Sequence, residues 1–389
     1  MAFEESVLLS SGLKQSTRTE LAVLRAIWFG GAETRAQIGA QTGLSRPTVI
    51  AALNALRSQK LIRSERRKAG SLGRDPELLS IDPRAVVGLG VDVGGTKTSA
   101  AIVDLLGEII AESTIPTVRG EPGELIASIA TMRDQLLASA GLESRKVPFA
   151  AIGMPGVLQD DGRLLHTGTL TGLDTSDVRG LFIEQLGCEV HIENDVNMAA
   201  YGELLNAQSF SVGTRVLISV GTGLGMGIVH GGEVIRGSTG HAGEIAFLPI
   251  SEDLQSPEAK QHGAAELVVC GPKFESRYMA LSGRRLSSER ILQSYLDEDP
   301  HAATAVEEIA FQLARVVVSV AVTLDPEVIV MTGGLGSNSI LLDPLRRAVE
   351  AISPLTVKLE LARFGTRAGL VGATTYAQRH LQKAITSGA

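Results

Sequence analysis

Residues 92–97 read Asp-Val-Gly-Gly-Thr-Lys and could bind a phosphorylated ligand. Alternating apolar residues and glycines on both sides predict two strands joined by a Gly-rich turn. Two glycines would let backbone N–H groups approach a ligand closely, and such groups bind phosphate. The aspartate could hold a magnesium ion through water, while the threonine and the lysine add a hydroxyl group and a cation. An ordinary Gly-rich hairpin is the alternative. The predicted binding residues are Asp92, Gly94, Gly95, Thr96 and Lys97.

A second Gly-rich turn lies at residues 221–225, again between two apolar segments. The first turn is not a Walker A loop, because the pattern Gly-x-x-x-x-Gly-Lys-Ser/Thr is absent and no helix is predicted directly after it. It instead resembles the first phosphate loop of the actin-like sugar kinases. Gly221, Thr222 and Gly223 stand where the second phosphate loop of those proteins is expected. Two such hairpins in one chain are a more specific signal than one.

The triplet Glu193-Asn194-Asp195 ends a predicted strand and leads into a predicted helix at 196–205. A carboxylate at the end of a strand can face a cleft and take a proton from a hydroxyl group. In phosphoryl transfer it would act as the base while Gly-rich loops hold the phosphates. We therefore predict Asp195 as the base; capping of the following helix is the alternative role.

Strands alternate with helices through the rest of this part of the chain, which predicts an α/β fold. Further strands are expected at 98–103, 108–115, 149–156 and 328–332. Further helices are expected at 122–140, 306–324, 341–352 and 369–381.

Residues 1–82 differ in charge from the rest of the chain. They contain 12 Lys/Arg and 8 Asp/Glu, whereas residues 83–389 contain 24 and 35. A basic head on an acidic body predicts that only the head binds a polyanion. Chance variation in composition is the alternative.

The head is predicted to fold as a helix-turn-helix followed by a β-hairpin wing. A helix at 19–29 precedes two helices capped by Thr34 and Ser45, and strands at 61–66 and 77–81 flank a basic loop. The third helix would read bases in a major groove, and the wing would contact phosphates and a minor groove. A protein-docking module is the alternative. The predicted DNA-binding residues are Ser45, Arg46, Thr48, Asn54, Arg66, Arg67, Lys68 and Arg74.

Composition argues against several classes of protein. No apolar run reaches the ~18 residues of a membrane span, and the acidic start of the chain lacks the apolar core of a secretory signal. The two cysteines, Cys188 and Cys270, lie far apart, so a disulfide framework is not expected. These features lead us to expect a cytoplasmic protein without a membrane partner.

The body resembles the ROK family, which contains sugar kinases and sugar-responsive repressors. The resemblance covers essentially the whole body, and an N-terminal winged helix marks the repressor branch of the family. The motifs that carry it are Asp92-Val-Gly-Gly-Thr-Lys97, Gly153-Met-Pro-Gly156, Glu193-Asn-Asp-Val-Asn197, Gly221-Thr-Gly-Leu-Gly225, Gly243-Glu244 and Gly333-Gly-Leu-Gly336.

The resemblance implies a role for each matched residue. Asp195 corresponds to the catalytic base, and the two Gly-rich hairpins correspond to the phosphate loops. The residues that correspond to sugar-binding positions are Asn194, Asp195, Glu244 and Glu266, and those of the adenosine site are Gly333 and Gly334. ATP and magnesium would be the ligands of a kinase site, and DNA binding would require no cofactor.

The sequence departs from the family at its zinc site. The family has a histidine that serves both sugar and zinc, and Phe247 stands in its place here. When the sequences are aligned on Glu266, the family's three zinc-binding cysteines fall on Pro257, Ala259 and Ala264. Because tetrahedral zinc needs four ligands, no structural zinc ion is expected, and no other metal site is predicted. Replacement of the histidine also predicts an altered sugar pocket.

We therefore expect an actin-like (ribonuclease H-like) two-lobed α/β body preceded by a winged helix-turn-helix domain. The expected parts are a DNA-binding domain at 1–82, a small lobe at 88–194 with about 376–389, and a large lobe at 195–375. The expected function is a sugar-responsive transcriptional regulator, in the first place a repressor. It would bind double-stranded operator DNA as a homodimer or dimer of dimers, under the control of a sugar or phosphosugar. An ATP-dependent sugar kinase is the alternative, and a partner-binding module that has lost both roles is a third.

Overall fold

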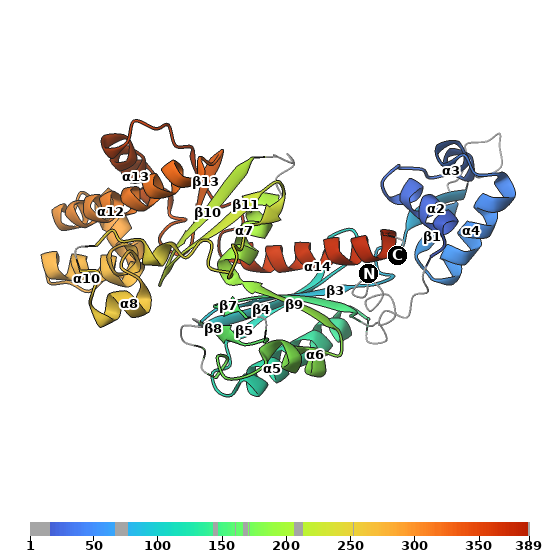
Figure 1. Ribbon diagram of the computed structural model, residues 1–389, viewed down its shortest axis with the longest axis horizontal. Coiled ribbons are helices and arrows are strands. Elements are labelled where there is room, and N and C mark those ends of the chain that lie inside the picture. Colours follow the sequence, from blue (N-terminus) through green and yellow to red (C-terminus); the bar gives the residue numbers. More distant parts are fainter. Residues whose placement is uncertain are drawn as a thin grey trace. The chain divides into compact units, whose positions relative to one another are not determined.

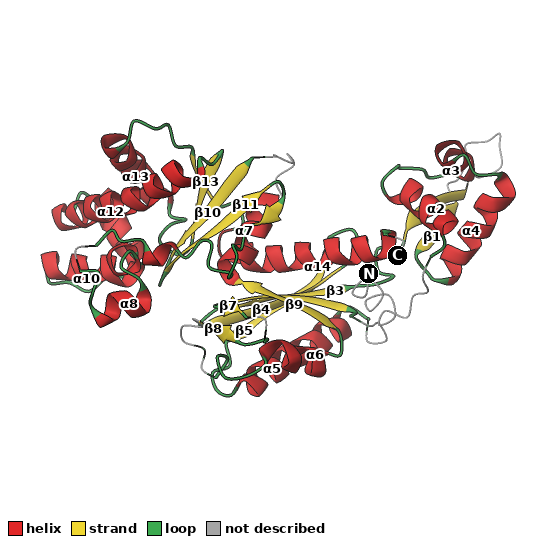
Figure 2. Cartoon of the chain, viewed as in Figure 1, coloured by secondary structure: helices red, strands yellow, loops and turns green. Residues whose placement is uncertain are grey.

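The chain folds into two compact units built from helices and strands (Figures 1 and 2). Unit 1 contains Met1–Ile152, Asp160–Ile192 and Thr374–Ala389, and unit 2 contains Gly153–Gln159 and Glu193–Ala373. The computed structural model describes residues 16–66, 77–142, 147–159, 161–165, 170, 172–205, 213–251 and 253–387. Each unit has a five-stranded sheet covered by helices, so the predicted α/β class is confirmed.

Unit 1 begins with the head, whose described residues form three helices and a pair of antiparallel strands. These elements are α2 (Arg18–Trp28), α3 (Arg35–Thr42), α4 (Arg46–Ser58), β1 (Ile62–Arg66) and β2 (Glu77–Ile81). Leu24, Ile38, Leu53 and Leu56 are fully buried between them. The order of these elements is the one predicted for a winged helix-turn-helix domain; residues 67–76, which would form the tip of the wing, lie outside the described residues.

Local capping interactions set the boundaries of the helices in the head. The side chain of Thr34 accepts a hydrogen bond from the backbone N–H of Gln37, and the Gln37 side chain accepts one from the backbone N–H of Thr34. Ser45 caps α4, as predicted: its side chain accepts a hydrogen bond from the backbone N–H of Thr48. Gly43 ends α3 with a φ of 69°, a left-handed conformation that favours glycine.

The sheet of unit 1 has the strand order β5-β4-β3-β6-β9. The strands are β3 (Gly88–Val93), β4 (Lys97–Val103), β5 (Ile109–Pro116), β6 (Phe149–Met154) and β9 (Glu189–Asn194). Helices α5 (Pro122–Ser139) and α6 (Val178–Leu186) cover one face, and the later part of α14 (Ala368–Thr386) covers the other (Figure 1). A Cβ atom on Gly90 would lie 2.6 Å from the backbone nitrogen of Thr374, so the glycine allows α14 to pack directly on β3.

The sheet of unit 2 has the strand order β12-β11-β10-β13-β14. The strands are β10 (Thr214–Val220), β11 (Leu224–His230), β12 (Glu233–Val234), β13 (Val328–Thr332) and β14 (Leu359–Leu361). Strands β10 and β11 form the second predicted hairpin, and β13 lies parallel to β10. Helix α7 (Asp195–Leu205) packs on β10 and β11, while α12 (Pro300–Leu324) and α13 (Ser339–Ile352) lie on the other side of the sheet (Figure 1).

Several helices of unit 2 were not predicted or have different bounds. Helix α12 begins at Pro300 rather than at 306, because the Asp299 side chain caps it and Pro300 occupies its first turn. The helices that the sequence analysis did not predict in this unit are α8 (Pro257–His262), α9 (Glu266–Val269), α10 (Gly271–Ser282) and α11 (Ser288–Leu296). Helices α8 and α9 have six and four residues, too few for hydrophobic periodicity to identify them; α10 and α11, with 12 and 9 residues, were missed despite their length.

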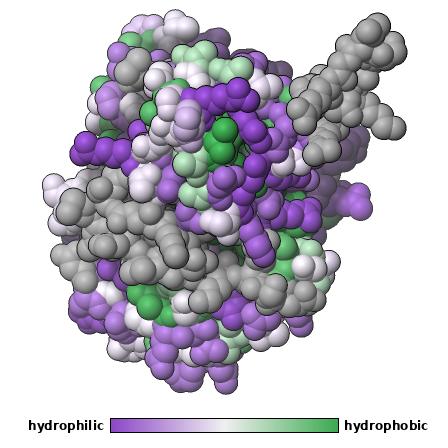
Figure 3. Space-filling model, turned by 90° about the vertical axis from the view of Figure 1, so that its right-hand side faces the viewer, coloured by the Kyte–Doolittle hydropathy of each residue, from purple (hydrophilic) through white to green (hydrophobic). Residues whose placement is uncertain are grey.

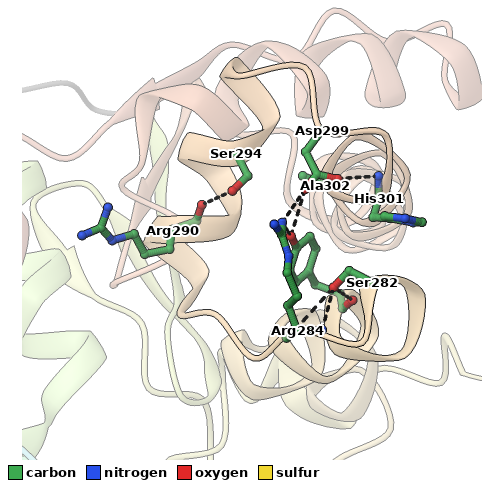
Figure 4. Close-up of polar contacts among 8 residues, drawn as sticks. Ser282, Arg284, Arg290, Ser294, Asp299, His301 and Ala302 are labelled. Atoms are coloured by element: carbon green, nitrogen blue, oxygen red, sulfur yellow. Dashed lines mark hydrogen bonds and ion pairs between the residues drawn. The ribbon is translucent and has the colours of Figure 1, made fainter.

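A polar cluster joins α10 to the start of α12 (Figure 4). The Tyr278 hydroxyl donates a hydrogen bond to Asp299 Oδ2 at 3.0 Å, and Arg284 Nη2 lies 2.6 Å from the same oxygen. Asp299 Oδ1 accepts a hydrogen bond from the backbone N–H of His301 at 2.8 Å. Burial opposes ionisation of Asp299, but these donors and the Arg284 charge outweigh it and lower the pKa of the carboxyl group. The cluster therefore links α10 to the N-terminus of α12 through the charged capping residue Asp299.

Most residues coloured in Figure 3, which shows the side that lies on the right in Figure 1, are hydrophilic. Hydrophobic residues appear on that face only in small separate areas, as is usual for a surface exposed to water. Within the described ranges, none of the helices has both the length and the apolar character needed to cross a bilayer.

Candidate functional site

The second Gly-rich turn lies beside the predicted adenosine residues in unit 2. Both Leu335 and Gly336 donate backbone hydrogen bonds of 2.9 Å to the carbonyl oxygen of Val220, which is the last residue of β10. Gly333 has a φ of 86°, and a Cβ atom there would lie 2.5 Å from the same oxygen, so only glycine fits. A Cβ atom on Gly221 would lie 3.6 Å from the nitrogen of Gly334. The parallel strands β10 and β13 thus bring the two turns together at one edge of the sheet.

Glycines in β11 place the start of α7 next to this turn. A Cβ atom on Gly225 would lie 2.8 Å from a methyl carbon of Val196, and one on Gly227 would lie 2.5 Å from the Cβ atom of Ala200. The helix therefore packs directly on the backbone of the strand. Asp195, the first residue of α7, lies beside the second hairpin as a result.

Asn194 provides the cap of α7. Its Oδ1 atom accepts hydrogen bonds from the backbone N–H groups of Val196 at 2.9 Å and Asn197 at 3.2 Å. Its side-chain nitrogen donates to the carbonyl oxygen of Gly156 at 3.3 Å. The helix-capping role that the sequence left open for Asp195 thus belongs chiefly to Asn194, although Asp195 Oδ1 also lies 2.9 Å from the N–H of Val196.

Three predicted carboxylates, those of Asp195, Glu244 and Glu266, are gathered on one side of unit 2. Burial raises the pKa of Asp195, the N–H of Val196 opposes this rise, and the negative charge of Glu244 adds to it. Burial likewise raises the pKa of Glu266; the N–H of Leu224 and the His262 side chain oppose it, and Glu244 again adds to it. Carboxylates with raised pKa values are suited to accept protons or hydrogen bonds from hydroxyl groups.

Close backbone contacts hold Glu244 and Glu266 in this cluster. Gly243 has a φ of 99°, and a Cβ atom there would lie 2.2 Å from the carbonyl oxygen of Met226 in β11. Glu266 Oε2 accepts a hydrogen bond of 2.9 Å from the backbone N–H of Leu224, the first residue of β11. Both acidic residues are therefore fixed to the strand that follows the second Gly-rich turn.

The residues predicted from the sequence to replace the family's zinc ligands are apolar. Ala259 lies buried in α8, Ala264 is buried shortly after it, and the side chain of Phe247 is 44% exposed. Burial raises the pKa of the Cys270 thiol, which disfavours the thiolate that a metal would need. In the part of the chain that the structure describes, no group of three or more His, Cys, Asp or Glu side chains is placed to hold a metal ion.

The first Gly-rich turn lies in unit 1 and is braced by two side chains. The Thr117 hydroxyl donates to the carbonyl oxygen of Gly94 at 2.7 Å, and Arg119 Nη2 donates to that of Gly95 at 2.9 Å. Thr96 and Lys97 are exposed at the turn, and Asp92 is half-buried in β3. Arg119 was not predicted. It comes shortly after β5, the strand that pairs with β4, and this position near the first turn was the signal that could have identified it.

The head presents most of the described DNA-binding candidates to solvent. Arg46 and Asn54 are exposed on α4, and Ser45 is exposed before it, with its hydroxyl 2.7 Å from that of Thr48. Arg66 is the last residue of β1. Arg67, Lys68 and Arg74 lie outside the described residues.

Comparison with known proteins decides the family. The ROK family model matches residues 88–380. The chain belongs to the ROK family. The matched region covers both Gly-rich hairpins, the three gathered carboxylates and the Gly333–Gly334 turn, so the resemblance seen in the sequence is confirmed.

ROK relatives of this chain include both kinases and repressors. The chain is 28% identical over 305 residues to a glucokinase of Halalkalibacterium halodurans, covering 73% of this chain and 92% of that protein. It is 24% identical over 381 residues to the xylose repressor of Bacillus subtilis, covering 94% and 96%. A solved ROK family transcriptional regulator, described as a homologue of the E. coli Mlc protein, has the same fold, with a TM-score of 0.71, 22% identity and coverage of 94% and 96%. The repressor and regulator matches include most of the head.

Proposed function

We propose that this ROK protein is a sugar-responsive transcriptional regulator, acting as a repressor. The observation that carries the proposal is the winged helix-turn-helix head joined to a body with three gathered carboxylates. The head presents Arg46 and Asn54 on the exposed face of α4, where a recognition helix contacts base edges. Two proteins that match nearly the whole chain are a repressor and a transcriptional regulator.

The body would supply the response to sugar. Hydroxyl groups of a sugar donate hydrogen bonds, and Asp195, Glu244 and Glu266 supply acceptors from two helices and a loop. A sugar that binds one arrangement of the body more tightly than another shifts the population toward it, and this shift would change the affinity of the head for DNA. Because helix-turn-helix proteins bind paired half-sites, we propose a homodimer or dimer of dimers on a near-palindromic operator.

Phe247 points to the class of sugar. It stands where the family has a sugar-binding histidine, so an unmodified glucose would lose one hydrogen bond there, worth roughly 0.5–1.5 kcal/mol. A sugar that carries an apolar group, or a phosphosugar held by a Gly-rich turn, would lose less. We therefore expect a sugar derivative or phosphosugar to bind more tightly than free glucose.

A second candidate function is an ATP-dependent sugar kinase. The observation that favours it is the position of Asp195, whose pKa is raised, at the start of a helix packed on the strand that follows the Gly221–Gly223 turn, in a chain similar to a glucokinase. Asp195 would accept the proton of the attacking sugar hydroxyl, while the Gly-rich turns would hold the phosphates of ATP. Magnesium, if bound near Asp92, would offset the phosphate charge.

Sugar binding and operator binding can be measured in two steps. An operator is first selected from random-sequence DNA with the purified protein. Thermal shift with D-glucose, D-xylose, N-acetyl-D-glucosamine and D-glucose 6-phosphate then finds the sugar that binds, and operator release is measured with it. We expect Glu244→Ala to weaken sugar binding at least about 10-fold and to leave operator affinity unchanged.

Glu258→Ala is the matched control, because Glu258 is exposed on α8 in the same unit. It should leave both affinities unchanged. Failure to select any operator would contradict the regulator, whereas ADP formation that depends on sugar and on Asp195 would favour the kinase.

A further inference from the structure

Glu193 is a buried carboxylate that has no role in either of the two functions considered above. It is the residue before Asn194 in β9, and its side chain is 8% exposed. Its Oε1 atom accepts hydrogen bonds of 3.1 Å from the backbone N–H of Asn194 and from the side-chain nitrogen of Asn197. One carboxylate oxygen therefore binds both the strand end and the first turn of α7, on either side of Asp195.

The other oxygen of Glu193 binds Arg236. Both Nε and Nη2 of Arg236 contact Oε2, at 2.6 and 2.5 Å. Arg236 comes shortly after β12, and its backbone carbonyl accepts a hydrogen bond of 3.1 Å from the N–H of Ala242. That bond closes the loop that leads through Gly243 to Glu244.

We propose that Glu193 and Arg236 form a clamp that positions the sugar-binding carboxylates of Asp195 and Glu244. The side chain of Arg236 holds the junction of β9 and α7, and its backbone holds the loop that carries Glu244. The proposal deepens the proposed function: Arg236 is a positioning residue for the sugar site and is not itself a ligand.

Arg277→Ala provides a matched control for Arg236→Ala. Arg277 pairs with Glu308 in the same unit, and its side chain is 43% exposed, compared with 44% for Arg236. Removing either arginine deletes one ion pair, but the carboxylate left behind differs: Glu308 is exposed, whereas Glu193 is buried. Only the loss of Arg236 should disturb the sugar site.

Two measurements on the full-length protein test the clamp. Hydrogen exchange should become faster in Arg236→Ala both at 193–199 and at 242–246, and Arg277→Ala should leave these segments unchanged. Affinity for the tightest-binding of the four sugars should fall at least about 10-fold in Arg236→Ala, should recover in part in Arg236→Lys, and should not change in Arg277→Ala. Unchanged exchange at either segment, or an unchanged sugar affinity, would overturn the clamp.

The double variant Glu193→Gln/Arg236→Ala separates the clamp from a simple charge effect. Removing Arg236 alone leaves Glu193 as a buried charge without its cation, which is itself costly. If the clamp positions the site, the double variant should bind sugar as weakly as Arg236→Ala, and a return to wild-type affinity would overturn the proposal. If none of the four sugars stabilises the wild-type protein, the proposed sugar response is contradicted. The exchange measurement would still decide whether the clamp exists.

Discussion

Arg25 and Thr386 lie 361 positions apart in the sequence and are joined by two hydrogen bonds. Nε and Nη2 of Arg25 donate to the carbonyl oxygen of Thr386 at 3.0 and 2.5 Å. Arg25 belongs to α2 of the head, and Thr386 is the last residue of α14. A cation at the C-terminus of a helix also interacts favourably with the helix dipole. The contact therefore attaches the head to the last helix of the same unit.

We expect Arg25→Ala to loosen this attachment. Loss of the charged donor should lower the free energy of unfolding of unit 1 by about 1 kcal/mol and should speed hydrogen exchange in α2 and at the end of α14. Denaturant unfolding and exchange mass spectrometry measure both effects. Arg18→Ala, an exposed arginine at the start of the same helix, is the control and should change neither. Equal effects of the two substitutions would contradict a specific role for the Arg25–Thr386 contact.

Arg46 and Arg67 should contribute to DNA binding in different ways. Arg46→Ala should weaken binding to the selected operator far more than binding to random DNA, because a base contact carries sequence information. Arg67→Ala should weaken both and reduce the salt dependence of binding, because a phosphate contact releases counterions. Fluorescence anisotropy at several salt concentrations measures both. Similar losses on operator and random DNA for both variants would show that the predicted division is wrong.

Asp195 should make the folded protein less stable as the pH rises. Burial and the charge of Glu244 raise the pKa of Asp195, so the folded state holds its proton more tightly than the unfolded chain does. The more tightly held proton adds to the free energy of unfolding. This contribution is fully present below the pKa of the unfolded chain, about 3.9, and is lost as the pH rises through the higher pKa of the folded state.

Asp195→Asn removes this ionisation and keeps a side-chain oxygen that can accept a hydrogen bond from the backbone N–H of Val196. The variant should melt at a higher temperature than wild type at pH 7, and this advantage should shrink toward pH 4. Asp343→Asn, at a residue whose side chain is 76% exposed, is the control. A variant that is less stable than wild type at pH 7 would contradict the raised pKa.

We predict that the purified protein contains no stoichiometric structural zinc. Phe247, Pro257, Ala259 and Ala264 stand at the four positions where the family has zinc ligands, and tetrahedral zinc requires all four. Dialysis against a chelator should therefore leave the melting temperature unchanged. About one zinc ion per chain in elemental analysis after dialysis would show that the alignment on Glu266 is wrong.

The sequence alone determined the features that depend on residues close together in the chain. Thr34 and Ser45 cap their helices through residues three positions further on, and each Gly-rich turn joins adjacent strands. The ROK motifs likewise identified the body, because each motif is a short segment whose backbone must approach a ligand or another strand. Such local patterns can be read from the sequence, since their energetics need few distant partners.

Only the tertiary structure decided which residues act together at the site. Packing of α7 on the glycines of β11 set the start of that helix, and with it Asp195, beside the second hairpin. The pairing of Glu193 with Arg236, and of Arg25 with Thr386, joins segments that no local pattern relates. The gathering of Asp195, Glu244 and Glu266 depends on three contacts with β11: the packing of α7 on its glycines, the close approach of the left-handed Gly243, and the hydrogen bond from Leu224 to Glu266. These contacts depend on how separate elements pack, and single-sequence periodicity contains no information about that packing.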